Sequence, residues 1–292
     1  MSEFLGRLAA RQLEAWAPTA LRRSRRATFV QTYDGPDGGV ADMALRGLTA
    51  VAHTVRGGQF SVVVVAPAGD PGLAARLGAV EAELPREVAV HALPGDAGLL
   101  PVALKAASAA GAPTFAFVVA AQEPPRAVLA AAAAGRPADL LLCSAAGEPG
   151  LRGALESAGF TLVNVVEVLI GGHPYGLAFG TGSERSLTAF KEALWSVPHP
   201  EGLRYREPAE RGGGLIDAPE GAPEVLRQEV LTQLGAAGGA LTVNDLRRHV
   251  LTHGGYRPAD LLAVVADLHD AGVVTHDRDD GRIGGDTTIR IA

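Results

Sequence analysis

The chain has 292 residues, of which 47% are hydrophobic and 20% are charged, and its formal net charge is −6. This composition excludes global disorder because it supplies enough apolar side chains for a sizeable core, and the length suits two domains of about 150 residues each. The negative charge argues against a protein whose whole surface binds nucleic acid, although a local basic patch stays open.

The single cysteine and the first residues bear on the compartment. Cys143 lies in the apolar run 138–145, where we expect a small buried core residue, and one cysteine cannot form an internal disulfide or a zinc site. The start Met-Ser-Glu-Phe lacks the pattern of a signal peptide, and no apolar stretch is long and unbroken enough to span a membrane. The sequence therefore predicts a cytoplasmic protein that makes no membrane contact.

Apolar runs alternate with segments of helical period through the first half of the chain. Residues 3–16 predict an amphipathic helix, after which four arginines occur within residues 22–26. We interpret this run as a solvated basic loop or a patch that pairs with the chain's own acids, with an anion-binding site as the alternative. Predicted strands occupy residues 27–33, 61–66, 88–93, 114–120 and 138–145, separated by predicted helices at 40–56, 71–84, 99–110 and 124–135.

The sheet is expected to end in a hairpin. A short helix at 151–158 precedes strand-like runs at 161–170 and 175–181, and the Gly-Gly-His-Pro between them predicts an antiparallel pair at one sheet edge. Five βα strands followed by such a hairpin are the strand inventory of the class I methyltransferase fold, a Rossmann-like sheet. We therefore predict an α/β domain over residues 1–197, with a mostly parallel sheet and a last helix at 184–195.

A change of composition marks a second, smaller domain. Residues 198–221 hold four prolines and a Gly-Gly-Gly run, which is typical of a linker. Helices are predicted at 223–234, from a Thr242 cap to about 252, and at 258–272, followed by strand-like runs at 273–277 and 282–291 around a turn. Three short helices and a β-hairpin are the plan of a winged-helix domain, which we predict over residues 222–292.

Three motifs in residues 175–208 resemble the three-Cys-motif partner family. The chain reads Tyr-Gly-Leu-Ala-Phe-Gly-Thr at 175–181, Ala-Phe-Lys-Glu-Ala-Leu-Trp at 189–195 and Gly-Leu-Arg-Tyr-Arg-Glu-Pro at 202–208. The family pattern has a Leu-x-Phe-x-Thr strand, a Met-Lys-x-Ala-Met-Trp helix and a Gly-x-aromatic tail in this order. The resemblance extends more weakly back to Phe4. It implies a bacterial methyltransferase-like domain with a small C-terminal domain and a partner protein that carries three cysteines.

The resemblance also indicates where S-adenosylmethionine would bind. The positions that match or lie near the family pattern are Asp34, Gly35, Asp37, Gly38, Asp70 and Asp96. The chain departs from the pattern because Gln31 replaces an acid in the first strand and Ala66 stands where an acid would accept hydrogen bonds from the ribose hydroxyls. Ordinary alternatives stay open, since the glycine run reads as a turn and both Asp70 and Asp96 read as helix caps.

The fourth strand indicates that the usual chemistry is absent. The family has Asp-Pro-Phe-Gly where this chain reads Val-Ala-Ala-Gln at 119–122. Val and Ala offer no donor, acceptor or base to position a nucleophile, and Gln122 and Glu123 read as the polar start of a helix. We therefore predict no catalytic residues. The histidines have no metal-site spacing, so no metal is predicted, and we interpret His249 and His253 as a surface pair.

Two hypotheses for function follow. The first is a catalytically degenerate methyltransferase-like protein without a cofactor, acting as a binding or scaffold partner in a bacterial complex. The alternative is an S-adenosylmethionine-dependent methyltransferase with a rearranged active site, for which nucleic acid is one substrate class. Because fold alone does not confer activity, we favour the first hypothesis and lean against an enzyme.

The charges of residues 223–292 bear on the partner. This region holds seven arginines and ten acidic residues, and the helix predicted at 258–272 carries three aspartates and no cation. Such a helix would repel DNA phosphates in the major groove. We therefore predict that the domain contacts a protein or a second copy of the chain, with DNA binding through Arg247, Arg248, Arg278 and Arg282 as the disfavoured alternative.

Overall fold

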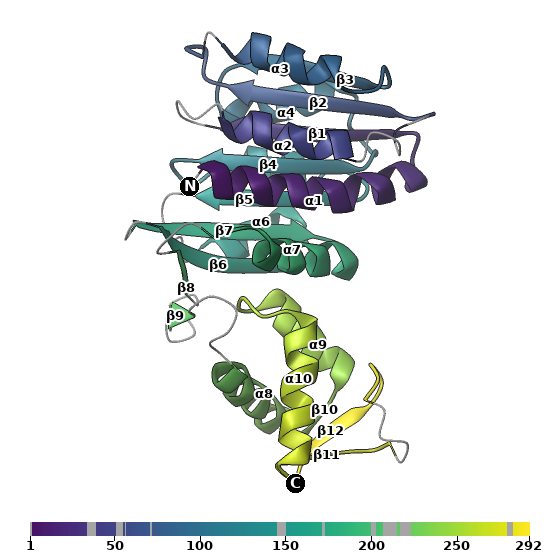
Figure 1. Ribbon diagram of the computed structural model, residues 1–292, viewed down its shortest axis with the longest axis vertical. Coiled ribbons are helices and arrows are strands. Elements are labelled where there is room, and N and C mark those ends of the chain that lie inside the picture. Colours follow the sequence, from purple (N-terminus) through teal and green to yellow (C-terminus); the bar gives the residue numbers. More distant parts are fainter. Residues whose placement is uncertain are drawn as a thin grey trace.

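The computed structural model describes residues 2–33, 39–50, 55, 57–70, 72–144, 150–170, 173–199, 203–206, 215–216, 223–278 and 283–292. Within these ranges the strands form two sheets. The larger has the order β3-β2-β1-β4-β5-β7-β6-β8-β9, and the smaller has the order β10-β12-β11 (Figure 1).

The first five strands of the larger sheet are parallel. They are β1 (Arg26–Tyr33), β2 (Gln59–Ala66), β3 (Val88–Pro94), β4 (Thr114–Ala120) and β5 (Ala138–Ser144). All but β3, at the edge, are buried along most of their length, as expected for apolar, valine-rich runs covered by helices on both faces. From β1, the next two strands are added on one side of the sheet, and β4 and β5 are then added on the other side. The strand order therefore changes direction between β1 and β4, and sheets of this kind bind ligands at that point.

The predicted hairpin consists of β6 (Leu162–Ile170) and β7 (His173–Thr181). These strands are antiparallel, and β7 lies between β5 and β6. The resulting order 3-2-1-4-5-7-6 with an antiparallel β7 is that of the class I methyltransferase fold, so the predicted fold class is confirmed. Two short strands, β8 (Arg204–Arg206) and β9 (Leu215–Ile216), extend the sheet beyond β6 from within residues 198–221.

Helices cover both faces of the sheet. On one face lie α1 (Ser2–Arg23), α2 (Gly39–Ala50), α3 (Leu73–Ala82) and α7 (Glu184–Ser196), and on the other lie α4 (Leu100–Ala106), α5 (Arg126–Ala132) and α6 (Leu151–Ala158). A 3-10 turn, Ala97–Leu99, precedes α4. The first face holds most of the aromatic core, in which the rings of Phe179 and Phe190 stack with centroids 4.6 Å apart.

Helix α1 is longer than predicted. It runs through Pro18 to Arg23 instead of ending at residue 16. Proline inside a helix removes one hydrogen bond, but Trp16, Ala17 and Ala20 are buried against the sheet, and this packing holds the helix together across the proline. Arg22 and Arg23 therefore lie in the last helical turn, which favours cations, and the prediction of a loop at these two positions is wrong.

The buried side chains of the C-terminal region are continuous with the core on the first face of the large sheet. The elements of this region are α8 (Pro223–Ala236), β10 (Ala240–Thr242), α9 (Val243–Thr252), α10 (Pro258–Asp270), β11 (Val274–His276) and β12 (Thr288–Ile291). The hydroxyl of Thr242 accepts a hydrogen bond from the Asp245 backbone at 3.1 Å, which confirms the predicted cap. None of the helices in the described ranges is both long and apolar enough to cross a membrane.

Lys191 and Trp195, both in the motif that resembles the three-Cys-motif partner family, join the two regions. Lys191 is fully buried on α7, and its Nζ donates to the carbonyls of Val250, 3.3 Å away, and Gly254 at the end of α9. Trp195 Nε1 donates to the Gly255 carbonyl at 2.7 Å. The last carbonyls of a helix lack donors within the helix, so α7 supplies donors that α9 needs.

Neighbouring elements add to this junction. Asn164 of β6 donates to the Gly254 carbonyl at 3.0 Å, and Arg152 of α6 donates to the Thr252 carbonyl at 2.6 Å. Arg248 of α9 pairs with Glu184 at the start of α7, with N–O distances of 3.1 and 3.2 Å. The C-terminal region, which lies beside the β6 end of the large sheet in Figure 1, is therefore fixed to this sheet by side-chain donors.

Candidate functional site

The carboxyl ends of the parallel strands meet at one edge of the sheet. The register pairs Tyr33 of β1 with Val119 of β4, and Ala66 of β2 with Pro94 of β3. Sheets of this class bind ligands at that edge, so it is the first place to look for a site. Four of the predicted cofactor-binding residues, Asp34, Gly35, Asp37 and Gly38, lie outside the described residues.

Asp70, which follows β2, is held by other residues of the chain. Its two carboxylate oxygens accept hydrogen bonds from Arg76 at 3.2 and 2.8 Å, from the Tyr33 hydroxyl at 3.1 Å and from the Gly72 backbone at 3.2 Å. The Arg76 hydrogen bonds, assisted by Tyr33, lower the pKa of Asp70 to about 2. The carboxylate is therefore ionised at neutral pH and already bound by four donors.

Asp96 and Gly95 have ordinary structural roles. Asp96 Oδ1 accepts from the Gly98 backbone at 2.8 Å and so caps the 3-10 turn before α4. Gly95 donates from its backbone to the Ala66 carbonyl at 2.7 Å, and a Cβ built at this glycine would lie 2.2 Å from Leu99 Cδ1. The Gly-Asp pair is thus explained by packing and capping, and no described contact joins Asp96 to Asp70.

The end of β4 presents no reactive group. Ala120 is buried, and Ala121, Gln122 and Glu123 are exposed. Among the described residues, no hydrogen bond or ion pair organises the Gln122 or Glu123 side chain, and Pro124 follows at once. A general base must lie in hydrogen-bond geometry with the group it deprotonates, usually oriented by a further residue. The described end of this strand has no such arrangement.

Gln31 is a feature of β1 whose importance sequence reasoning missed. It is 0% exposed, and neither its amide nitrogen nor its amide oxygen has a hydrogen-bond partner among the residues that the structure describes. Each such buried group costs about 1–3 kcal/mol unless something binds it. The sequence marked this position only as a departure from the family pattern, because burial and missing partners are not visible in a sequence.

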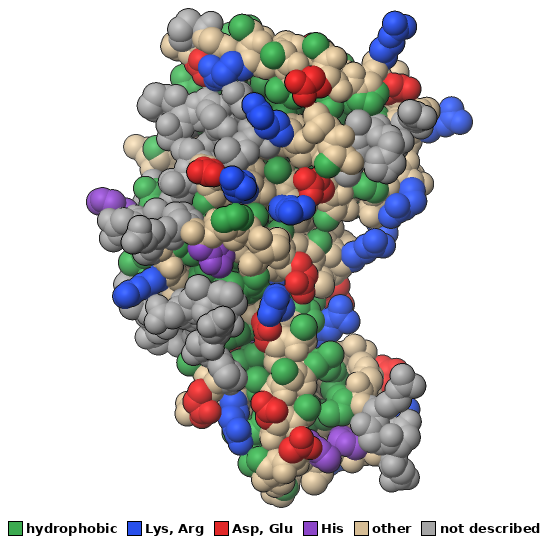
Figure 2. All heavy atoms as spheres, viewed as in Figure 1, with side chains coloured by type: hydrophobic (Ala, Val, Ile, Leu, Met, Phe, Trp, Pro, Cys, Tyr) green, Lys and Arg blue, Asp and Glu red, His purple; other side chains and the backbone are tan. Residues whose placement is uncertain are grey.

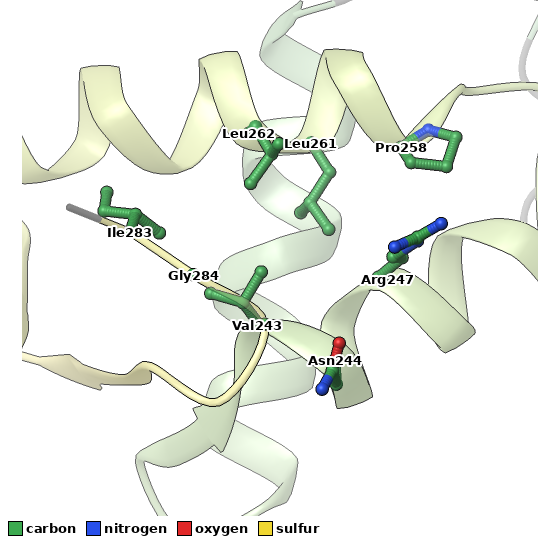
Figure 3. A pocket seen from close by; sticks show the side chains of 9 residues that line it. Val243, Asn244, Arg247, Pro258, Leu261, Leu262, Ile283 and Gly284 are labelled. Atoms are coloured by element: carbon green, nitrogen blue, oxygen red, sulfur yellow. The ribbon is translucent and has the colours of Figure 1, made fainter.

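The predicted binding arginines of the C-terminal region do not form one patch. Arg248 is taken by Glu184, whereas Arg247 lines a small pocket of about 110 Å³ with Leu261, Leu262 and Ile283 (Figure 3). The exposed Arg278 lies in the segment after β11, and Arg282 lies outside the described residues. Arg248 therefore lies toward the large sheet and Arg247 toward α10, although the two residues are adjacent in sequence.

Helix α10 keeps the acidic character expected from the sequence. Asp260 accepts from the Arg257 guanidinium at 2.7 and 3.2 Å and from its backbone at 2.8 Å, which closes a capping box. Asp267 and Asp270 are exposed. Asp260 is thus used for capping and Asp270 lies 3.6 Å from His269 Nδ1, while the exposed carboxylates of Asp267 and Asp270 would repel phosphates.

The described histidines of the C-terminal region contact one another and nearby acids in pairs. His249 lies 2.7 Å from Glu229, its side chain is only 16% exposed, and its ring stacks on His253. The interpretation of this pair as a surface pair is therefore wrong for His249, which lies on α9 and packs against α8. Among the described residues there is no group of three His, Cys, Asp or Glu side chains that could hold a metal ion.

Comparisons with known proteins add little to the fold. No family model matches the chain, and no curated protein matches it. One similar solved structure is that of EvdMO1, at 14% identity and a TM-score of 0.37, with 59% of this chain and 40% of that chain covered. Another is the N-terminal domain of EvdMO1 in the presence of SAH and D-fucose, at 13% identity and a TM-score of 0.35, covering 59% of this chain and 82% of that one.

A third similar structure is a predicted O-methyltransferase, protein Atu636 from Agrobacterium tumefaciens. It is 17% identical, with a TM-score of 0.29, and the match covers 60% of this chain and 81% of that one. The match covers 40% of the EvdMO1 chain, so this chain spans less than half of its length. The assignment to the class I methyltransferase fold rests on the order and direction of its strands.

Proposed function

We propose that this chain is a methyltransferase-fold protein that no longer transfers methyl groups and acts by binding, as a scaffold partner in a bacterial complex. The observation that supports this proposal most directly is the state of Asp70. It is the described carboxylate that follows β2, and its oxygens are already bound by Arg76, Tyr33 and the Gly72 backbone.

Ribose recognition needs a carboxylate that is free to accept two hydroxyl hydrogen bonds. Ala66, at the strand end itself, has no carboxylate, and Asp70 would have to give up a bidentate pair with the cationic Arg76 for hydrogen bonds to uncharged hydroxyls. Bidentate arginine–carboxylate pairs are among the strong hydrogen bonds of proteins, because both partners are charged and their geometry is matched. Binding of S-adenosylmethionine is thus disfavoured, and the alanines at the end of β4 leave a bound cofactor without a catalytic partner.

We further propose that the C-terminal region is a winged helix that contacts protein. Its element order, with β12 between β10 and β11, is that expected for a winged helix. The helix that would enter DNA, α10, carries Asp260, Asp267 and Asp270, and Arg248 is held by Glu184. The partner is either a second copy of this chain or another protein, and a protein with three cysteines is the one that the sequence resemblance implies.

Calorimetry with S-adenosylmethionine and its demethylated product tests the first proposal. We expect no saturable heat with the wild-type chain and no transfer of a radiolabelled methyl group to DNA, RNA or protein. The Arg76→Gln variant removes the guanidinium that holds Asp70, so binding that appears only in this variant would identify the ion pair as the block. Micromolar affinity together with turnover in the wild-type chain would overturn the proposal.

An active methyltransferase with a rearranged site is the second candidate, and the buried amide of Gln31 is the observation that favours it. A ligand at the end of β1 could satisfy that amide. The same calorimetry decides between the two, because the second candidate requires wild-type affinity that falls in Gln31→Leu. A wild-type chain without affinity eliminates it.

A further inference from the structure

A second cavity lies at the opposite edge of the sheet, where the parallel strands begin. It has a volume of about 280 Å³ and lies between the C-terminal half of α1, the N-terminus of α7 and Pro137 before β5. This volume is close to the lower limit of small-molecule sites. Because it lies where the strands begin, the cavity is separate from the strand ends that Asp70 and Asp96 follow.

Two arginines from distant parts of the chain line this cavity. Arg23 ends α1 and Arg185 begins α7, and both are exposed. Neither forms an ion pair or a side-chain hydrogen bond with any residue that the structure describes. Arg22, Arg25 and Arg26 lie in the same basic run, and Figure 2 shows Lys and Arg side chains along the edge where α1 ends and α7 begins. The cavity thus lies in a positive field.

The N-terminus of α7 adds to this field. Ser183 caps the helix by accepting from the Ser186 backbone at 3.3 Å, and both serines line the cavity. A helix N-terminus favours an anion through its free backbone donors and dipole. Of the acids nearby, Glu184 is paired with Arg248, whereas Asp139, whose pKa burial raises to about 6, is still mostly ionised at neutral pH and interacts electrostatically with Arg23, so it offsets part of this field.

Buried polar atoms without partners indicate that a ligand completes the site. Gln12 and Trp16 line the cavity one helical turn apart on α1 and are 1% and 5% exposed. Within the described part of the chain, neither Gln12 Oε1, an acceptor, nor Trp16 Nε1, a donor, has a hydrogen-bond partner. A ligand that hydrogen-bonds to both atoms must carry an acceptor oxygen for Trp16 Nε1 and a hydroxyl donor for Gln12 Oε1.

The geometry points to a binding site for a small phosphorylated polyol or sugar between α1 and α7. The phosphate lies with Arg23, Arg185 and the N-terminus of α7, and a hydroxyl donates to Gln12. Arginine matches the oxygens of a phosphate with two parallel donors, and two guanidiniums favour a dianion over a single carboxylate. The site is independent of the strand-end crevice, so its test and that of the proposed function fail separately.

Calorimetry of the full chain with glucose 6-phosphate, inorganic phosphate and glucose tests this site. We expect glucose 6-phosphate to bind most tightly, inorganic phosphate more weakly and glucose not measurably. Arg23→Gln and Arg185→Gln should each weaken binding by about tenfold or more, and Trp16→Phe, which removes only Nε1 among the polar atoms, by a few-fold. Thermal unfolding checks that each variant is folded.

Arg26→Gln is the matched control because it removes the same charge from the same basic run without lining the cavity. We expect it to change the affinity less than about twofold. Equal losses in Arg26→Gln and Arg23→Gln would overturn the proposal, as would the absence of saturable heat. Tighter binding of single-stranded RNA that every arginine variant weakens equally would also overturn it, in favour of a nucleic-acid surface.

Discussion

Lys191 offers the sharpest test of how the two regions are joined. The side chain is 0% exposed, and its Nζ donates to Val250 and Gly254. In Lys191→Met the aliphatic volume is kept, but both hydrogen bonds are lost. The Gly254 carbonyl keeps its bond from Asn164, whereas the Val250 carbonyl loses a donor in the last turn of α9. Bonds to charged donors contribute about 1.5–3 kcal/mol each, so the loss of both should lower the free energy of unfolding by about 3–6 kcal/mol.

The chain supplies its own control, because Lys105 is the only other lysine. Lys105 is exposed on α4, and Lys105→Met should change stability by less than about 0.5 kcal/mol. Urea unfolding measures both variants. Acetylation of the native wild-type chain gives a second readout, in which Lys105 should react fast and Lys191 only when the junction opens. Equal labelling of the two lysines, or a Lys191→Met variant as stable as the wild type, would refute the reasoning.

Three further predictions follow from buried charge, chain path and surface charge. Burial raises the pKa of Asp139 from 3.8 to about 6, although hydrogen bonds from the Thr181 and Ser186 side chains oppose this rise. The stability that this carboxyl contributes is therefore present below pH 3.8 and is lost as the pH rises through 6. Asp139→Asn should therefore match the wild type at pH 4 and exceed it by about 3 kcal/mol at pH 8 in urea unfolding; an unchanged difference across this range would contradict the assignment. Limited digestion with trypsin, and with thermolysin in parallel, should cut first within residues 198–221, and because side-chain donors hold the two parts together the fragments should coelute in gel filtration and separate only on denaturation. First thermolysin cuts inside β2 or β5, which contain no tryptic site, would contradict the strand assignment. Duplex DNA should show no salt-sensitive mobility shift with the full chain, and a shift that the double variant Arg247→Ala with Arg248→Ala abolishes would favour DNA over a protein partner.

The sheet could be predicted because its signal is local. Each strand of the parallel set is a run of apolar residues bounded by turn chemistry, and the Gly-Gly-His-Pro segment marks the hairpin. Helix ends were harder to predict. Pro18 indicates a stop, but burial of Trp16 and Ala20 outweighs it, and this burial depends on a sheet that forms from residues far along the chain.

The candidate sites could be predicted only in part, since side chains distant in sequence define them. The sequence nominates Asp70 as a ligand or a cap, and only the structure brings Tyr33 and Arg76 to it. Similarly, the basic run 22–26 could not be paired with Arg185, which is more than 150 residues away and lies beside Arg23 only because α7 packs on α1. The role of Lys191 was hidden for the same reason, because the carbonyls it binds belong to another region.

The two edges of the sheet differ in how their charges are used, and this difference bears on where function resides. At the carboxyl edge, Asp70 forms an ion pair with Arg76, so the carboxylate that would accept hydrogen bonds from a ribose is already bound within the chain. At the amino edge, Arg23 and Arg185 stay unpaired among the described residues, above a donor and an acceptor that are buried without partners. Buried polar groups without described partners occur near both edges, since Gln31 of β1 is another, so the difference lies in the cations: Arg76 is used by Asp70, whereas Arg23 and Arg185 are available to an anionic ligand at the amino edge. A protein that keeps the methyltransferase sheet can therefore serve as a binding module without using the crevice for which the fold is known.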